Sequence, residues 1–294
     1  MTRTTRGEDD SLLSACSRVL VVAHREDTSQ LRQALEGEGF AVEEVRGPYT
    51  AQQENFSAIM RCFVNHANAW RKVVEYGEPA IVVEADFVPV RGLGRFPVPS
   101  PKDEEGNCLP YLYAVSPEIW DLARPDIARG HAGGLVAVLI YPKIAALLLQ
   151  YFDEEILANP TGAYTPFDSK LGYWLLERKV QSYFPYRHYG EHGGIANPEH
   201  ARAGLGRPHQ ADVLQGKLAF RPMYARGSIA RYWRVRCRAR FWGMARLLCG
   251  RYLPARDFRR SSKWPMLRYV VGRFALRSIP SRRRNLAPQE VREE

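Results

Sequence analysis

The stretch Ala80-Ile-Val-Val-Glu-Ala-Asp-Phe-Val-Pro-Val90 decides the fold expected for this chain of 294 residues. Four small or β-branched apolar residues are typical of a buried strand, and two carboxylates, Glu84 and Asp86, follow where that strand should end. In an open α/β sheet, ligands bind outside the carboxyl ends of the strands, so a cation carrying a diphosphate would bind at this point. The alternative is a polar strand end at which Glu84 caps a neighbouring helix.

The residues before this stretch predict a β-α-β opening. Apolar runs at 18–23 and 40–45 indicate strands, and 27–37 between them indicates a helix. His24 and Arg25 would then lie at the carboxyl end of the first strand, where doubly wound folds commonly receive a nucleotide. No G-x-G-x-x-G or Walker-type loop is present, which disfavours a Rossmann dehydrogenase or a P-loop enzyme.

The strongest helix signal covers 57–76 and ends at Gly77 and Pro79. Its apolar residues recur at helical spacing and form one stripe: Ile59, Phe63, His66, Trp70 and Val73. A second, polar stripe that could face a ligand consists of Arg61, Asn65 and Asn68. A histidine within an apolar stripe is more often a hydrogen-bonded core residue than a catalyst, so His66 has two open interpretations.

The helix segment Arg61-Cys-Phe-Val-Asn-His-Ala-Asn-Ala-Trp70 and the strand end Val83-Glu-Ala-Asp86 resemble motifs of glycosyltransferase family 25. That family has a Cys-x-x-Ser-His-x-x-x-Trp helix and a Glu-Asp-Asp strand end. The resemblance runs from about Val19 to Pro185 and takes in further segments: Gly130 to Ala132, Leu135 to Tyr141, Ile144 to Leu148, and Pro166 to Asp168.

The resemblance implies a GT-A-like, Rossmann-type doubly wound α/β fold and the transfer of a hexose, such as galactose, from a nucleotide-sugar to a lipid-linked oligosaccharide or lipopolysaccharide. It implies Mn²⁺ or Mg²⁺ bound by Glu84 and Asp86. The donor side would also include His24, Arg25, Arg61, Asn65 and His66. Two residues depart from the family pattern: Asn65 replaces the usual Ser, and Ala85 replaces the middle acid. Because successive strand residues point to opposite faces, Glu84 and Asp86 share a side only if the chain stays extended between them.

Two residues further along are candidates for the chemistry. His131 lies among glycines before an apolar strand at 135–141, where a ligand could approach the backbone or the chain could turn tightly. Asp168 opens a predicted helix, where it could serve as an N-cap or as the general base that takes a proton from an acceptor hydroxyl. The loop 91–110 could be a substrate lid or a disordered surface segment.

The segment 183–200 is rich in Tyr, Arg, His and Gly. Its histidines lack the tight spacing of a zinc hydrolase site, so a sugar-binding loop is the alternative to a polar surface loop. As a sugar-binding loop, it would contact the acceptor through Tyr186, Arg187, Glu191 and His192.

Charge divides the chain near residues 217 to 228. Residues 1–216 carry 21 basic and 28 acidic residues, whereas 217–284 carry 20 basic residues and one acid, Asp257. Two helical stripes of aromatic and aliphatic residues lie in this basic part, one running from Ile229 to Leu248 and the other formed by Trp264, Leu267, Val271 and Phe274. Basic amphipathic helices with Trp and Phe favour an anionic membrane surface, and nucleic acid is the rival partner, although no recognition motif is present. The predicted organisation is a disordered start (1–16), an α/β domain (17–227), a basic helical extension (228–284) and a disordered tail (285–294).

The remaining features narrow the class of protein. Five scattered cysteines indicate neither a disulfide framework nor a zinc ribbon. The N-terminus lacks an apolar signal region, and the longest apolar segment, 132–149, is broken by Pro142 and Lys143. We therefore expect a cytoplasmic, peripheral enzyme on the inner face of the cytoplasmic membrane. The alternatives are a catalytically silent relative that binds a glycan or membrane, and a basic nucleic-acid-binding protein.

Overall fold

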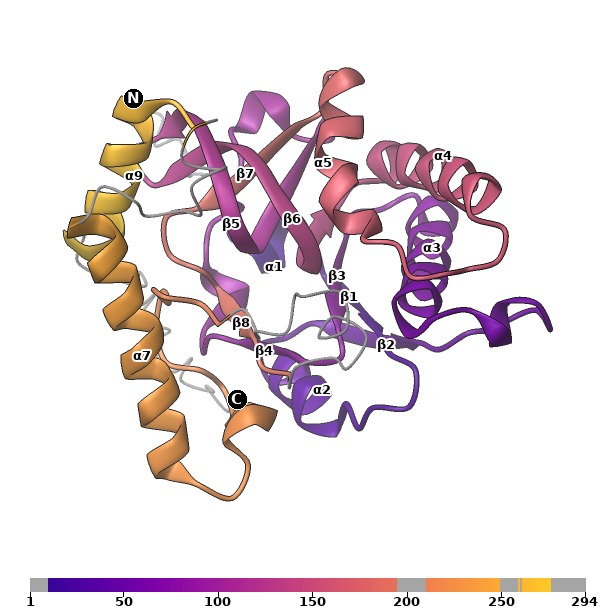
Figure 1. Ribbon diagram of the computed structural model, residues 1–294, viewed down its shortest axis with the longest axis horizontal. Coiled ribbons are helices and arrows are strands. Elements are labelled where there is room, and N and C mark those ends of the chain that lie inside the picture. The colour runs from indigo at the N-terminus through magenta and orange to yellow at the C-terminus, as the bar shows by residue number, and fades with distance from the viewer. Residues whose placement is uncertain (1–9, 195–209, 249–258, 260, 276–294) are drawn as a thin grey trace, which may run out of the picture.

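The computed structural model describes residues 10–194, 210–248, 259 and 261–275, except for the side chains of 115, 116, 243–248 and 275. Six strands form the main sheet in the order β2-β1-β3-β6-β5-β7 (Figure 1). Their bounds are β1 Arg18–Val22, β2 Ala41–Val45, β3 Ala80–Glu84, β5 Cys108–Arg124, β6 Ile127–Ile140 and β7 Gln181–Pro185. The predicted α/β class is confirmed.

The parallel part of the sheet consists of β2, β1 and β3. The helix α2 (Ser29–Glu36) joins β1 to β2, and α3 (Ala58–Tyr76) joins β2 to β3. Because β1 lies between the other two strands, the two crossovers run in opposite directions, and right-handed crossovers place α2 and α3 on opposite faces. Because β1 and β3 are parallel neighbours, their carboxyl ends lie side by side at the same end of the sheet. Helices cover both faces of the sheet there.

The helix α3 has a well-defined start and end. Ser57 caps it by accepting a hydrogen bond from the Met60 N–H, and Gly77 ends it in the left-handed conformation with a φ of 66°. Its buried side packs against α4 (Pro142–Ala158), and Phe63 stacks on Phe167 of α5 (Phe167–Glu177) with ring centroids 4.0 Å apart. This packing fixes the rotation of α3 about its axis.

The strands β5 and β6 form a long antiparallel hairpin that extends well beyond the predicted strands. The glycines at 130–134 lie inside β6, and at Gly130 the neighbouring strand makes a close backbone approach. A Cβ on Gly130 would lie 1.7 Å from the Glu118 carbonyl oxygen. Glycine is required here by strand packing.

A second, two-stranded sheet follows β3 directly. Its antiparallel strands are β4 (Phe87–Pro89) and β8 (Gly190–His192). The pairing brings the end of the segment 183–194 to the residues that follow Glu84, although about a hundred residues separate them in sequence.

The loop 91–110 packs at the amino ends of the parallel strands. Leu93 is fully buried, and the Gly92 N–H donates to Glu38, which precedes β2. Short 3-10 turns occur within the loop: η2 (Leu93–Arg95) and η3 (Lys102–Glu104). The loop is ordered and does not cover the carboxyl ends of the strands, so neither a lid nor a disordered segment is observed.

Two predicted boundaries are wrong. The short helix α1 (Leu12–Ala15) lies within the segment expected to be disordered, and Leu12 is fully buried. At the other end, α9 (Lys263–Ala275) packs against β5, and the Ser262 N–H donates to the Ile119 carbonyl over 2.7 Å. The helix α9 therefore belongs to the folded unit. The expectations for 1–9, 249–258, 276–284 and the tail 285–294 lie outside the described residues.

The helix α7 (Ile229–Leu248) runs beside the β4–β8 sheet, after a 3-10 turn, η4 (Met223–Ala225) (Figure 1). Among the helices of the described residues, none combines the length and the apolar character needed to cross a bilayer.

Candidate functional site

A cavity of about 290 Å³ opens at the carboxyl ends of β1 and β3. Its lining comes from β1, α3 and β3, from the residues that follow β1, β3 and β8, and from the 3-10 turn η4. The lining residues are Val22, Ala23, His24, Glu26, Ala58, Arg61, Cys62, Asn65, Glu84, Ala85, Asp86, Gly194 and Met223. This is the position expected for a ligand site in an open α/β sheet.

The two predicted acids meet in this cavity. Glu84 is the last residue of β3, and the chain turns at Ala85 and Asp86 instead of staying extended. The Ala85 N–H donates to the Val22 carbonyl, which holds the turn against β1. Despite the turn, carboxylate oxygens of Glu84 and Asp86 lie within 4.8 Å of each other. Replacement of the middle acid by alanine does not separate the outer two.

His192 completes a set of three with these acids. It pairs with Phe87 across the β4–β8 sheet, and the Gly193 N–H donates to the Asp86 carbonyl over 2.8 Å. The His192 Nε2 lies 2.9 Å from the Asp86 Oδ2. Ligand atoms of Glu84, Asp86 and His192 all lie within 4.8 Å of one another, which allows one cation to contact all three.

A close backbone approach and two buried polar atoms distinguish the surroundings of Asp86. A Cβ on Gly194 would lie 2.2 Å from the Asp86 Oδ2, so only glycine allows the chain to pass this closely. The Asp86 Oδ1 and the His192 Nδ1 are buried and have no hydrogen-bond partner among the described residues. Burial opposes protonation of His192, but the Asp86 and Glu84 carboxylates outweigh it and raise its pKa to about 9. These acids form a negative environment suited to a cation.

A second ligand set shares Glu84. The His66 Nε2 lies 3.3 Å from the Glu84 Oε1, and Cys62 stands one helical turn before His66 on α3. Cys62, His66 and Glu84 offer ligand atoms within 4.8 Å of one another. Burial, together with the Glu84 and Asp86 carboxylates, raises the pKa of the Cys62 thiol well above its usual value. Cys62 is thus a neutral thiol beside the acids.

Asn65 has a structural role at the rim of the cavity. Its amide donates to the Ala23 carbonyl and to the Tyr49 hydroxyl, and its Oδ1 accepts from the Gly47 N–H. Buried in this way, Asn65 ties the end of β1 to the segment after β2. An amide has both donors and an acceptor for these contacts, which a serine hydroxyl in its place could not satisfy together.

Of the other predicted donor-side residues, His24 and Arg61 line the cavity, whereas Arg25 does not. Burial and the nearby Arg25 guanidinium lower the pKa of His24, which lies 3.2 Å from the Tyr49 hydroxyl through its Nδ1. Arg61 donates to the Phe56 carbonyl and brings a positive charge to the rim. Arg25 is exposed.

The two predicted catalytic residues do not line the cavity. His131 is buried in β6, where it stacks on Tyr173 with ring centroids 4.0 Å apart and leaves no room for a side chain on Gly172. Asp168 is the second residue of α5, and Pro166 occupies the N-cap position, so Asp168 does not have the N-cap role that was one of its two possible roles. Its carboxylate does act on the cavity, since it contributes to the raised pKa of Cys62.

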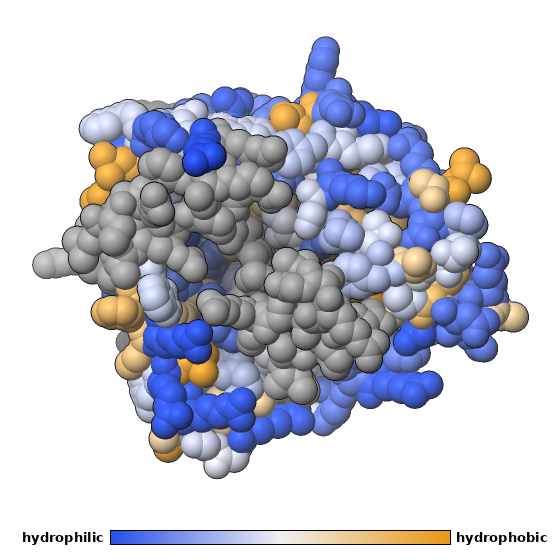
Figure 2. All heavy atoms as spheres, in the orientation of Figure 1, coloured by the Kyte–Doolittle hydropathy of each residue, from blue (hydrophilic) through white to orange (hydrophobic). Residues whose placement is uncertain are grey.

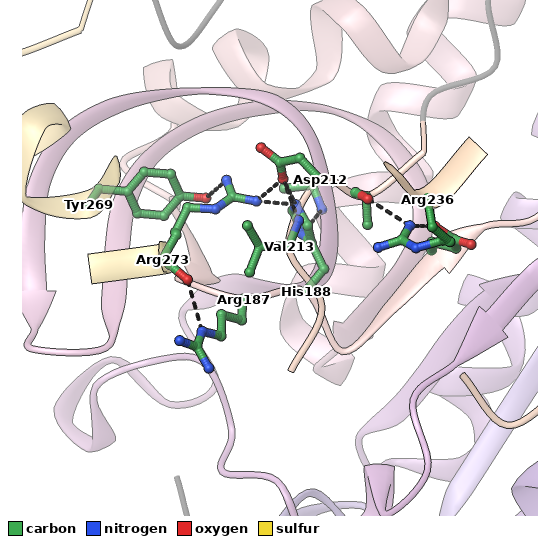
Figure 3. A network of polar contacts seen from close by, with 10 residues as sticks. Arg187, His188, Asp212, Val213, Arg236, Tyr269 and Arg273 are labelled. Atoms are coloured by element: carbon green, nitrogen blue, oxygen red, sulfur yellow. Dashed lines mark hydrogen bonds and ion pairs between the residues drawn. The ribbon is translucent and has the colours of Figure 1, made fainter. Parts of the chain in front are cut away.

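Three of the four predicted acceptor-binding residues hold the C-terminal helices instead. Tyr186 packs edge-on against Tyr269 of α9, and Arg187 donates to the Arg273 carbonyl over 2.9 Å (Figure 3). Glu191 is fully buried and pairs with Arg236 of α7, while the Tyr224 hydroxyl donates to it. Only His192 lies next to the cavity: it contacts Asp86, although it does not itself line the cavity.

Arg273 sits at the centre of a buried polar network (Figure 3). Its side chain is 1% exposed and contacts the Tyr269 hydroxyl, the His188 Nε2 and the Asp212 carboxylate. The helical period gave no indication of this burial, because the partners come from distant parts of the chain.

Sequence reasoning missed the position of His192 beside Glu84 and Asp86, and the presence of Cys62 and Glu26 in the cavity. The Gly-Glu-His-Gly-Gly run at 190–194 was the available signal, since paired glycines beside a histidine allow a close approach to another segment. No protein-family model matches this chain, and neither does any curated protein sequence.

Proposed function

We propose that this chain is a nucleotide-sugar-dependent glycosyltransferase with a GT-A-like fold, similar to family 25. The observation that carries the proposal is the convergence of Glu84, Asp86 and His192 at the carboxyl end of β3. Carboxylates favour hard cations, and an imidazole nitrogen favours Mn²⁺ over Mg²⁺. In this proposal, the cation would neutralise the diphosphate of the donor and so help the diphosphate to leave.

The residues of the chain then have distinct tasks. Glu84, Asp86 and His192 would hold the cation, while Arg61 and His24 at the rim would contact the nucleotide. The acceptor oxygen bonds to the anomeric carbon as the bond from that carbon to the diphosphate breaks, and Asp168 would take the hydroxyl proton. The donor is proposed to carry a hexose and the acceptor to be a glycolipid or lipopolysaccharide precursor at the cytoplasmic face of a membrane.

Thermal unfolding with a panel of nucleoside diphosphates, with and without Mn²⁺, tests this proposal. A nucleotide present at 100 times its Kd should raise the free energy of unfolding by about 2.7 kcal/mol, and Mn²⁺ should increase the effect. Asp86→Asn should remove the part that depends on Mn²⁺. Cys62→Ser is the matched control, because it changes only the second set, formed with His66 and Glu84, and leaves Glu84, Asp86 and His192 intact. If no nucleotide stabilises the wild type, the proposal fails.

A catalytically silent relative is the second candidate. Asp168 does not line the cavity, and this observation favours the silent candidate. Stabilisation by a nucleotide and Mn²⁺ without hydrolysis or transfer from any nucleotide-sugar of a panel would support the silent candidate over the enzyme.

A further inference from the structure

Large apolar side chains exposed to solvent gather on two helices. Among the described residues, nine such side chains are exposed, and seven of them belong to α7 and α9. They are Ile229, Trp233, Phe241 and Trp242 on α7, and Trp264, Leu267 and Val271 on α9. Scattered exposed apolar residues need no explanation, but a concentration of this kind marks an interaction surface. We call these seven residues the apolar face.

The helix α7 turns its apolar stripe outward. Trp233 is 59% exposed and Phe241 is 66% exposed, whereas Arg236 on the inner side reaches the buried Glu191. The helix α9 buries Met266 and Tyr269 together with Arg273, but it also leaves large apolar side chains outside, with Trp264 67% exposed. A helix that only packs on a domain buries its apolar stripe and exposes its charges, so these two helices present an unusual outer side.

Basic residues surround the apolar face. Six of them are exposed on the same two helices: Arg231, Arg234, Arg238, Arg240, Lys263 and Arg268. Figure 2 shows orange side chains beside blue ones along the margin of the molecule where Figure 1 places α7 and α9. Trp and Phe between basic side chains are typical of helices that lie in a membrane interface.

The apolar face is held in place by the buried contacts of its two helices. The pairs Arg236–Glu191 and Arg273–Asp212 attach α7 and α9 to the rest of the domain. The Arg240 guanidinium lies over the Phe274 ring, 5.8 Å from its centroid, so the two helices are neighbours. The face is therefore formed before any partner binds.

We propose that the apolar face of α7 and α9 docks on an anionic lipid surface. The basic residues favour an anionic partner, and the exposed Ile, Leu and Val side chains favour acyl chains, because they cannot stack on bases as aromatic rings do. A second copy of the chain would bring the same positive charges together and is disfavoured. This inference goes beyond the proposed function and holds whether or not the cavity transfers a sugar.

Co-sedimentation of the full chain with phosphatidylcholine vesicles, with and without phosphatidylglycerol, tests the proposal. Binding should require the anionic lipid, weaken with salt and persist in part at 0.15 M, where the Debye length is about 8 Å. The Trp233→Ala/Trp264→Ala variant should bind about tenfold more weakly and lose its remaining binding at high salt. Leu157→Ala is the matched control, because Leu157 is 83% exposed on α4, away from the apolar face.

Three further measurements distinguish lipid docking from the other partners. Lipids with brominated acyl chains should quench the tryptophan fluorescence of the wild type more than that of the double variant, which shows insertion directly. Equal vesicle binding by the double variant would overturn the proposal. It would also be overturned if modest amounts of duplex or single-stranded nucleic acid released the vesicle-bound protein, or if the double substitution abolished a dimer formed without lipid.

Discussion

The Asp86 carboxylate occupies an unusual position, since one of its oxygens faces His192 at 2.9 Å and the other is buried without a hydrogen-bond partner among the described residues. A buried oxygen without a donor is costly, and a cation would satisfy it. Gly194 makes the geometry possible because its backbone passes where a Cβ would collide with Asp86.

Gly194→Ala should therefore displace Asp86 and weaken Mn²⁺ binding by about tenfold or more, while the chain stays folded. Titration of Mn²⁺ in the presence of a nucleoside diphosphate measures the effect. Gly133→Ala serves as a matched control, because a Cβ there meets nothing within 4 Å. If both variants bound Mn²⁺ like the wild type, the role assigned to Gly194 would be wrong.

Asp168→Asn separates the roles considered for this residue. Since Pro166 occupies the N-cap, the change should lower the free energy of unfolding by no more than about 1 kcal/mol, through the lost charge in the first turn. If Asp168 is the general base, the turnover of Asp168→Asn should fall by about two to four orders of magnitude, while nucleotide binding is retained. Turnover within a few-fold of the wild type would leave Asp168 with a structural role alone.

His188 should make stability depend on pH. Burial and the neighbouring Arg273 guanidinium lower the pKa of His188 to about 3, although Asp212 acts in the opposite direction. Below pH 6.5 the unfolded chain binds a proton here that the folded chain does not. The free energy of unfolding should therefore fall by up to about 1.4 kcal/mol per pH unit as the pH drops from 6.5 toward 4. Denaturant titrations of the wild type and of His188→Gln should show a shallower fall in the variant, and parallel curves would contradict this assignment.

At the scale of elements, the buried pair Glu191–Arg236 joins β8 to α7. Sequence patterns predicted the helix at α7, but they treated the segment that contains β8 as a loop, assigned Glu191 to an acceptor and placed the C-terminal helices outside the domain. The reason is that burial of a charge depends on a partner that lies 45 residues away in the chain. Periodicity reports the faces of one helix and cannot report which distant segment covers them.

Removing only one partner of this pair should be costly. Arg236→Met leaves a buried, unpaired carboxylate and should lower the free energy of unfolding by about 3–5 kcal/mol. The double variant Glu191→Gln/Arg236→Met should recover much of that loss, because no charge remains unpaired. Denaturant unfolding of both variants measures the difference. Similar losses in the two variants would mean that the charges matter little here. For the same reason, a chain truncated after Gly227 should be strongly destabilised instead of remaining an intact soluble domain.

At the scale of the whole molecule, local signals predicted the class of the fold. The apolar run at 80–83, the helix predicted at 57–76 and the glycine and proline breaks after it correspond to β3, α3 and the end of α3. Of the long β5–β6 hairpin, the apolar end at 135–141 was predicted, whereas its central part was not, because the residues there include polar side chains and glycines that are stabilised by pairing with the other strand. The position of the cavity, at the carboxyl ends of the parallel strands, was predicted correctly. The place of His192 beside it could not be predicted, because it depends on the long-range pairing of β4 with β8.

The most direct test of the proposed cation site is Mn²⁺ binding followed by electron paramagnetic resonance with a saturating nucleoside diphosphate. We expect one bound Mn²⁺ per chain and a nitrogen modulation from an imidazole ligand, both retained in Cys62→Ser. Asp86→Asn should weaken binding by about tenfold or more, and His192→Gln should abolish the nitrogen modulation. Absence of a bound Mn²⁺, or a nitrogen signal that survives His192→Gln, would contradict the assignment of Glu84, Asp86 and His192 as the cation site.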